Sequence, residues 1–305
     1  MHRLAHGHDQ TTEEAYHAAA LYLQGRLGAE TAGSYTTEIF PEAKLGSETE
    51  MLAAVCRGDL AMATVTAANA AVTIPELGLF SAPYLFQGPE HFRRVIENDG
   101  FRDLVTDTIA ARQPSLRCLA YFTPGPRNLY TRKRPVTSPE DLRGLRMRVM
   151  ASPAESQVWA SLGVEPVPMP FREIHDALAT GHVDAADDTA AVYGSQRHYE
   201  VAPFHMLTRH QWSLALLLIN DSIFEALPGR VRSALIGIGR DLAAHVVDFA
   251  VRSERSYLEK LRQNSVVTIA PVDVPSFTKA FEGVAESLSE ALSMTRALER
   301  ILRFR

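Results

Sequence analysis

The chain has 305 residues, 46% of them hydrophobic and 22% charged, and its net charge at pH 7 is -5. Those proportions are typical of a globular protein large enough for two domains, and they exclude a disordered or fibrous chain. No dense basic segment is present, which argues against a nucleic-acid partner because phosphate binding needs clustered Lys and Arg. The best apolar run, 214–219, is too short to cross a bilayer and suits a buried strand, so we expect no membrane insertion.

The N-terminal sequence MHRLAHGHDQ has no apolar stretch like that of a signal peptide. The residues alone therefore leave two locations open: the cytoplasm, or a compartment reached with a leader that has been removed. Cys56 and Cys118 each lie in an apolar pattern, and we expect two small buried side chains rather than a disulfide.

The first part of the chain alternates strand-like and helix-like segments. Thr12 is predicted to be the N-cap of the first helix, and Gly58 ends the second. The predicted strands are 3–8, 36–40 and 60–65, and the predicted helices are 12–27 and 48–57.

In the middle of the chain, short helices end at glycine and lead into strands. Ser138 and Ser152 each stand before a proline, which is the pattern of an N-cap followed by the first helical residue. Glycines 144, 163 and 181 end the helices that follow. The predicted strands are 146–149, 164–169 and 183–187, and the last predicted helix is 171–180. Repeated helix–strand alternation predicts a layered α/β fold.

Residues 227–264 are predicted to form one long helix, because apolar residues recur at helical spacing from Ile236 to Phe249. A helix of this length spans roughly 50 Å at about 1.5 Å per residue, which is more than one small domain needs. We expect it to brace two lobes. The tail, 276–305, is predicted to continue as an amphipathic helix without chemistry of its own.

Enzyme signatures are missing: the chain has no nucleophile elbow, no phosphate loop and no dinucleotide-binding glycine motif after a strand. His6 and His8 share one face of the first strand, but no third ligand accompanies them at a diagnostic spacing. We therefore expect neither a metal nor a cofactor. His210 stands before the apolar strand at 214–219. Its side chain either lines a cleft or caps the local backbone, and the sequence does not decide between the two.

Two arginines point to anion recognition. Arg127 lies in a proline-set loop after an apolar strand, at the edge where open α/β sheets bind ligands. Arg148 lies on the strand 146–149, and arginine is rarely buried without a partner. Two converging guanidiniums suit a carboxylate, which each can bind through two parallel hydrogen bonds. Spacing alone leaves internal salt bridges equally open.

Several longer segments resemble one known family, in order and at the expected spacing from the first strand to about Val274. They include FPEAKLGSETEMLAAVCRGDLAMATV, GPRNLYTRKRPVTSPEDLRGLRMRVMASP and LGVEPVPMPFREIHDALATGHVDA. These segments resemble the substrate-binding proteins of tripartite ATP-independent periplasmic (TRAP) transporters, of the C4-dicarboxylate-binding (DctP) type.

The resemblance implies a two-lobed receptor that closes around a small organic acid and delivers it to membrane permease subunits. It also implies a periplasmic monomer whose leader has been removed. With the long helix shared, lobe I is expected to comprise 1–123 and about 213–248, lobe II 124–212 and about 249–275, and the tail 276–305.

The resemblance also implies which residues hold the ligand. Arg148 matches the family's main carboxylate-binding arginine, and Arg127 a second arginine in the cleft. The other residues implied are Phe171, which packs on the ligand, Glu48 and Thr66 from the opposite lobe, and His8 or Gln10 from the first loop.

Two positions depart from the family pattern. Asp188 stands where the family commonly has an asparagine that helps to hold the ligand carboxylate. A second carboxylate repels an anion unless it pairs with an arginine or accepts hydrogen bonds from hydroxyl or amino groups. This favours a sugar acid, another hydroxylated acid or a zwitterion over a plain dicarboxylate. Ala61 replaces the family's aspartate, so no polar role carries over there.

Two other functions stay open. An enzyme on a similar α/β frame, a lyase or hydrolase acting on an organic acid, would use His210 or Asp188 as a general base. A sensor module would hand the same ligand to a signalling partner. The predicted function remains that of a receptor without enzymatic activity.

Overall fold

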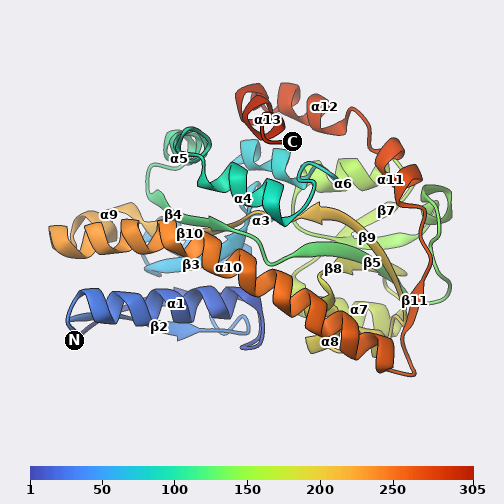
Figure 1. The fold of residues 1–305 in the computed structure, drawn as a ribbon, viewed down its shortest axis with the longest axis horizontal. Coiled ribbons are helices and arrows are strands. Elements are labelled where there is room, and N and C mark those ends of the chain that lie inside the picture. The colour runs from blue at the N-terminus through green and yellow to red at the C-terminus, as the bar shows by residue number, and fades with distance from the viewer.

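The computed structural model describes residues 1–305 and contains two β-sheets flanked by helices (Figure 1). The first sheet has the strand order β2-β1-β3-β10-β4 and the second β11-β9-β5-β8-β6-β7. We call the first sheet with its helices lobe I and the second with its helices lobe II. In both sheets, parallel strands are combined with antiparallel ones.

Lobe I is built around the buried strand β10, which has apolar residues on both faces because both faces of the sheet are covered. Helix α2 shows why local sequence fixes an end: Ser47 and Glu50 form a capping box, and Gly58 closes the helix with a φ of 82°. The elements of lobe I are β1 (His2–Gly7), α1 (Ala15–Glu30), β2 (Tyr35–Phe40), α2 (Glu48–Arg57), β3 (Met62–Thr66), α3 (Ala67–Ala70), η1 (Pro75–Ser81), α4 (Pro89–Glu97), α5 (Asp99–Arg112), β4 (Leu116–Phe122), β10 (Ala215–Asn220) and α9 (Asp221–Glu225).

Lobe II contains the short helix–strand repeats of the middle of the chain. Its elements are β5 (Pro126–Thr131), η2 (Pro139–Leu142), β6 (Arg146–Val149), α6 (Pro153–Ala160), β7 (Glu165–Pro168), η3 (Phe171–Glu173), α7 (Ile174–Thr180), β8 (Ala185–Asp188), α8 (Ala190–Ser195), η4 (His198–Glu200), β9 (Phe204–Trp212) and β11 (Thr268–Ala270).

Helix α10 (Gly229–Gln263) is the predicted long helix, and it is continuous over 35 residues. It packs on α1 and β4 in lobe I and on α8 in lobe II, and it crosses the molecule diagonally (Figure 1). The prediction of an α/β fold with one helix shared by two lobes is confirmed. The chain passes between the sheets after β4 and after β9.

Two predicted elements were wrong in detail. The first helix begins at Ala15 rather than Thr12, because Gln10 accepts a hydrogen bond from the backbone N–H of Tyr16 and the intervening residues form a turn. The tail is not one helix. It forms α11 (Val274–Ala280), α12 (Val284–Ala291) and α13 (Thr295–Leu302), interrupted at Gly283 and Ser293, where φ is positive.

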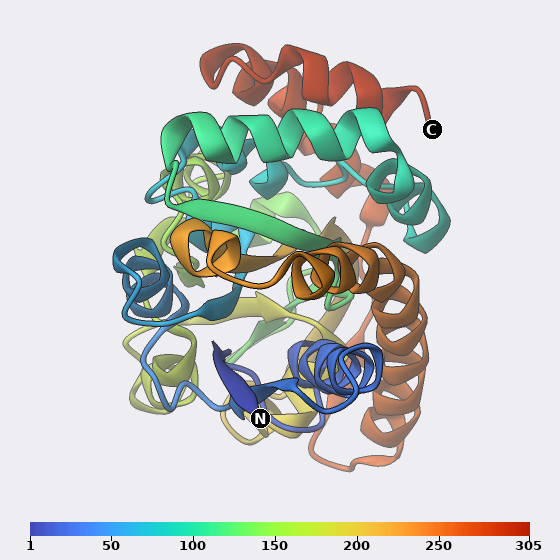
Figure 2. The ribbon, with the colours of Figure 1, turned by 90° about the vertical axis from the view of Figure 1, so that its left-hand side faces the viewer.

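The tail helices return to lobe I after lobe II is complete. Helix α13 packs on α5 and α12 packs on η1, so the C-terminal segment covers the outer face of the molecule at α5 (Figure 2). Cys56 and Cys118 are free thiols, and both are half-buried, whereas the sequence predicted buried side chains. None of the helices combines the length and apolar character that a membrane crossing requires.

Candidate ligand-binding site

A small cavity of about 30 Å³ lies between the two lobes. It adjoins a pocket of about 200 Å³, with which it shares Asp9, Glu48, Asn69 and Phe171. Strands β1, β3, β6 and β8 all end at this cavity, which is the edge where open α/β sheets bind ligands. The cavity is lined by Asp9, Gln10, Tyr16, Glu48, Thr66, Asn69, Pro124, Arg127, Arg148, Met150, Phe171 and Asp188.

Arg148 is buried at this cavity, with 2% of its surface exposed. Its Nε and one terminal nitrogen donate to the carbonyl oxygen of Met169, at 3.3 and 3.2 Å. No carboxylate forms an ion pair with it. Arg146, two residues earlier on β6, is half-exposed and is bound by Asp184 through two hydrogen bonds of 3.1 Å. Of the two arginines on this strand, Arg148 is the one that no carboxylate of the protein pairs with.

Arg127 is held by the protein itself. Its Nε donates to Asp187 at 2.6 Å, and His210 contacts the same carboxylate oxygen at 3.0 Å. Burial would raise the pKa of Asp187, but the Arg127 guanidinium and His210 outweigh it and hold that pKa well below the ordinary range. Arg127 therefore lies at the cavity with its charge already balanced.

Asp188 lines the cavity from the end of β8. Its Oδ1 accepts a hydrogen bond of 2.8 Å from the backbone N–H of Thr189 and lies 3.5 Å from a terminal nitrogen of Arg127. Burial raises the pKa of Asp188, against the attraction of Arg127. The carboxylate is thus bridged weakly to an arginine and also faces the cavity.

Glu48 lines the cavity from lobe I and is held by neighbouring residues of that lobe. Its Oε2 accepts three hydrogen bonds of 2.6 to 2.8 Å: from the backbone N–H and hydroxyl of Thr66 and from the amide of Asn69. Burial raises the pKa of Glu48 in spite of these donors. Asn69 in turn accepts a bond of 2.9 Å from the N–H of Ala151 in lobe II, which ties the two walls together.

The structure brings seven of the nine predicted site residues to the cavity and leaves two away from it. His8 is fully buried behind the wall, where its Nε2 contacts His17 at 3.2 Å and burial lowers its pKa to about 3. His210 does not line the cavity and contacts the Asp187 carboxylate instead. Gln10 lines the cavity, and Phe171 covers both the cavity and the adjoining pocket.

Sequence reasoning missed Asp9, Tyr16 and Asn69. Tyr16 is buried with a hydroxyl that has no partner, and Asp9 has no hydrogen bond to any protein group. Asn69 follows Thr66 by three residues, the spacing at which a residue meets an N-cap, and that signal was available. A lone Asp two residues after a strand forms no recognisable pattern.

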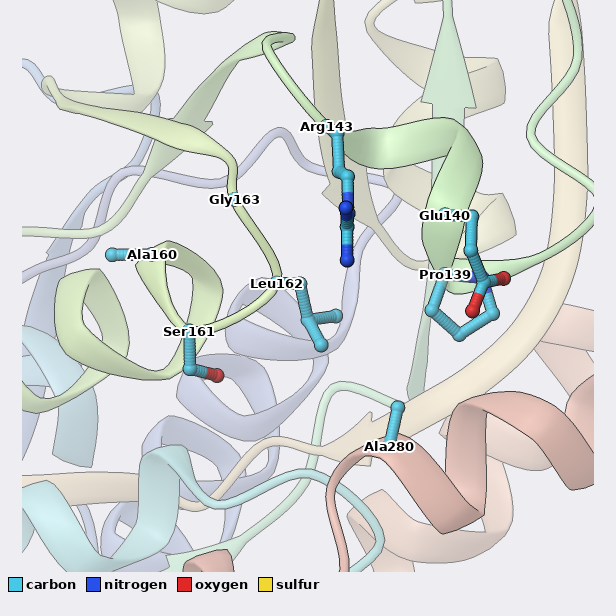
Figure 3. A pocket seen from close by; sticks show the side chains of 8 residues that line it. All are labelled: Pro139, Glu140, Arg143, Ala160, Ser161, Leu162, Gly163 and Ala280. Carbon is cyan, nitrogen blue, oxygen red and sulfur yellow. The ribbon is translucent and has the colours of Figure 1, made fainter.

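A larger hollow lies elsewhere and does not resemble a binding site. It measures about 540 Å³ and is bordered by η2, the end of α6 and Ala280 of α11 (Figure 3). Its charged side chains, Glu140 and Arg143, are exposed to solvent. A surface depression of this kind offers no desolvated polar group to a ligand.

Comparison with known proteins agrees with this geometry. Residues 6–291 match the model of the DctP family, described as bacterial extracellular solute-binding protein, family 7. The 2,3-diketo-L-gulonate-binding periplasmic protein YiaO of Escherichia coli K12 is 27% identical over 277 residues, covering 91% of this chain and 84% of YiaO.

Solved structures share the fold. The TRAP periplasmic solute-binding protein of Roseobacter denitrificans with bound β-D-glucuronate has a TM-score of 0.89 and 26% identity, with 98% of each chain covered. A homologous structure from Anaerococcus prevotii with bound D-glucuronate has a TM-score of 0.92 at 23% identity, and it supports the fold alone. The chain therefore belongs to family 7 of the bacterial extracellular solute-binding proteins, the receptors of TRAP transporters.

Proposed function

We propose that this protein is a periplasmic receptor that closes around a hydroxylated organic acid, such as a sugar acid, and delivers it to a TRAP permease. The observation that carries this proposal is Arg148, a buried guanidinium with no carboxylate partner at the inter-lobe cavity. Leaving such a charge unpaired is expensive, so a ligand carboxylate is its natural partner.

The opposite wall supports an acid that also carries hydroxyl groups. Oxygens of Asp9, Glu48 and Asp188 face the cavity, and each accepts hydrogen bonds when ionised. A second carboxylate on the ligand would meet these oxygens and be repelled. YiaO and the Roseobacter protein are described with ligands of this type, a diketo sugar acid and a uronic acid.

Site roles follow from this arrangement. Arg148 holds the ligand carboxylate, and Phe171 packs on the carbon skeleton. Arg127 lines the same cavity as a guanidinium that Asp187 already pairs with. Glu48, Thr66 and Gln10 contact the polar end from lobe I. His8 and His210 act through their neighbours rather than by touching the ligand. The lobe boundaries predicted at 123 and 212, with the long helix divided near 248, describe the two bodies that close.

An enzymatic function finds less support in the geometry. Of the two general bases that such an enzyme could use, Asp188 lines the cavity, but its Oδ1 accepts from the backbone N–H of Thr189 and lies 3.5 Å from Arg127. His210 has both ring nitrogens engaged, with Thr208 at 2.8 Å and Asp187 at 3.0 Å. It does not line the cavity. The cavity instead suits binding without chemistry.

The proposal is tested by identifying what the protein carries. Purified protein is denatured, and released small molecules are weighed by mass spectrometry. A thermal-shift panel of D-glucuronate, D-galacturonate, D-gluconate, succinate and a 2-oxo acid follows, because a specific ligand raises the melting temperature with dose. Dose-dependent stabilisation by hydroxylated monoacids supports the proposal, and stabilisation by succinate alone would refute it.

A further inference from the structure

The inter-lobe cavity holds more negative than positive groups. Two guanidiniums line it, and Asp187 already balances the charge of Arg127. Three further carboxyl groups, of Asp9, Glu48 and Asp188, line the same cavity. A ligand carboxylate that binds Arg148 therefore removes the last positive charge available to this wall.

Among the carboxyl groups of this cavity, Asp9 is the one without a hydrogen-bond donor from the protein. It lies two residues after β1, with 8% of its surface exposed, and it lines both the cavity and the adjoining pocket. No protein donor is bonded to its carboxylate, whereas Glu48 has three donors and Asp188 has a backbone N–H. A carboxylate that lines a cavity without a protein donor is open to a donor on the ligand.

The charges around Asp9 show what kind of partner suits it. Burial raises the pKa of its carboxyl well above the ordinary value, and Glu48, Glu14 and Asp188 raise it further. Arg148 alone acts in the opposite direction. Once a ligand carboxylate occupies Arg148, a neutral hydroxyl would give Asp9 a hydrogen bond but no balancing charge. A protonated amine would give both.

We propose that the acid held in this cleft is zwitterionic, with its carboxylate on Arg148 and a protonated amine beside Asp9 and Glu48. The inference rests on the proposed receptor function and narrows its ligand class to amino acids in the broad sense, with amino derivatives of sugar acids as the first candidates. Asp9 is then the residue that selects the amine over a hydroxyl group.

Proton counting distinguishes the two ligand classes. A plain monoanion brings a second negative charge near Asp9 and favours its protonated form, whereas the ammonium of a zwitterion favours the carboxylate. Binding of the monoanion should therefore take up more protons than binding of the zwitterion. Calorimetry in buffers of different ionisation enthalpy measures this uptake directly.

The experiment compares D-gluconate with D-glucosaminate, its 2-amino-2-deoxy counterpart, by calorimetry on the full chain at pH 7. The two probes differ only in a hydroxyl and a protonated amine. We expect D-glucosaminate to bind about tenfold or more tightly, and with less proton uptake than D-gluconate, because a charge-assisted bond to a buried carboxylate exceeds a neutral one. The Asp9→Asn variant should lose this preference, and the control Asp176→Asn, a change on an exposed carboxylate, should keep it.

Each outcome decides a different claim. Equal or tighter binding of D-gluconate by the wild-type protein overturns the zwitterion, and this comparison needs no variant to fold. Retention of the amine preference in Asp9→Asn overturns the role of Asp9. If neither probe nor any acid of the panel binds, the receptor function itself fails.

Discussion

At the scale of single residues, the site depends on which charges the protein has already paired. Arg146 and Arg148 lie two residues apart on β6, yet Asp184 binds the first and no carboxylate binds the second. The sequence showed that Arg148 needed a partner but not what that partner was. Pairing depends on which side chains the fold brings from a distance, and Asp187, 60 residues beyond Arg127, could not be chosen from spacing.

The buried pair of Arg127 and Asp187 should be costly to break. Asp187→Ala leaves the guanidinium of Arg127 buried without its main counter-charge, and we expect a loss of about 3–5 kcal/mol in the free energy of unfolding. Urea unfolding measures it. The matched variant Asp184→Ala breaks the half-exposed pair with Arg146 and should cost no more than about 1 kcal/mol. Equal losses in the two variants would contradict the assignment.

His205 gives a prediction for pH. Burial lowers its pKa to about 3, and neither ring nitrogen has a hydrogen-bond partner. Because the folded-state pKa of this base is depressed, the unfolded chain binds its proton first below pH 6.5, and stability falls as the pH drops towards 3. At pH 5 this costs about 2 kcal/mol.

The variant His205→Phe removes the titrating imidazole and keeps an aromatic ring stacked on Tyr193. We expect its melting temperature to rise relative to wild type as the pH falls from 7 to 5, with no such trend for His182→Phe at an exposed position. A difference between His205→Phe and wild type that stays constant with pH would show that His205 does not titrate in this way.

At the scale of elements, the structure shows where local sequence was decisive and where it was not. The capping residues and Gly58 located α2 well, because they act within one turn. The helical spacing of apolar residues located α10. The tail was predicted as one helix, but its breaks at Gly283 and Ser293 let it turn back onto lobe I. The packing of the tail on α5 joins segments nearly 200 residues apart, and no local pattern reports such a contact.

Helix α10 can lie close to β4 because Gly239 has no side chain. A Cβ added there would meet the carbonyl oxygen of Leu119 at 2.1 Å, so Gly239→Ala must displace the helix. We expect a loss of about 1–3 kcal/mol in unfolding free energy. Gly237→Ala, two residues away with open space around it, should be neutral or stabilise by up to about 1 kcal/mol. Similar effects of the two substitutions in thermal unfolding would contradict the packing argument.

At the scale of the whole molecule, hydrogen bonds across the cleft describe a closed form. Asn69 accepts from Ala151, the hydroxyls of Ser81 and Ser152 lie 3.2 Å apart, and Gln196 donates to Glu14 at 3.4 Å. Each of these contacts joins lobe I to lobe II. A ligand that touches both walls adds to this small set of bonds and shifts the population towards closure.

Small-angle X-ray scattering measures that shift. Addition of a stabilising acid from the thermal-shift panel should reduce the radius of gyration of the wild-type protein, because the closed form is the one that contacts the ligand from both sides. The same acid should leave the Arg148→Ala protein unchanged. A radius of gyration that does not respond to a tightly bound acid would contradict closure around the ligand.

Calorimetry on Arg148→Ala and Arg146→Ala, with the acid that gives the largest thermal shift, shows directly whether Arg148 holds the ligand. The two arginines share one strand and differ in whether a carboxylate of the protein already pairs with them. Arg148→Ala should weaken binding by about 100-fold or more, because the ligand carboxylate loses its charge-assisted bonds in a buried site. Arg146→Ala should bind as the wild type does. Near-normal affinity in a folded Arg148→Ala protein would show that Arg148 does not hold the ligand carboxylate.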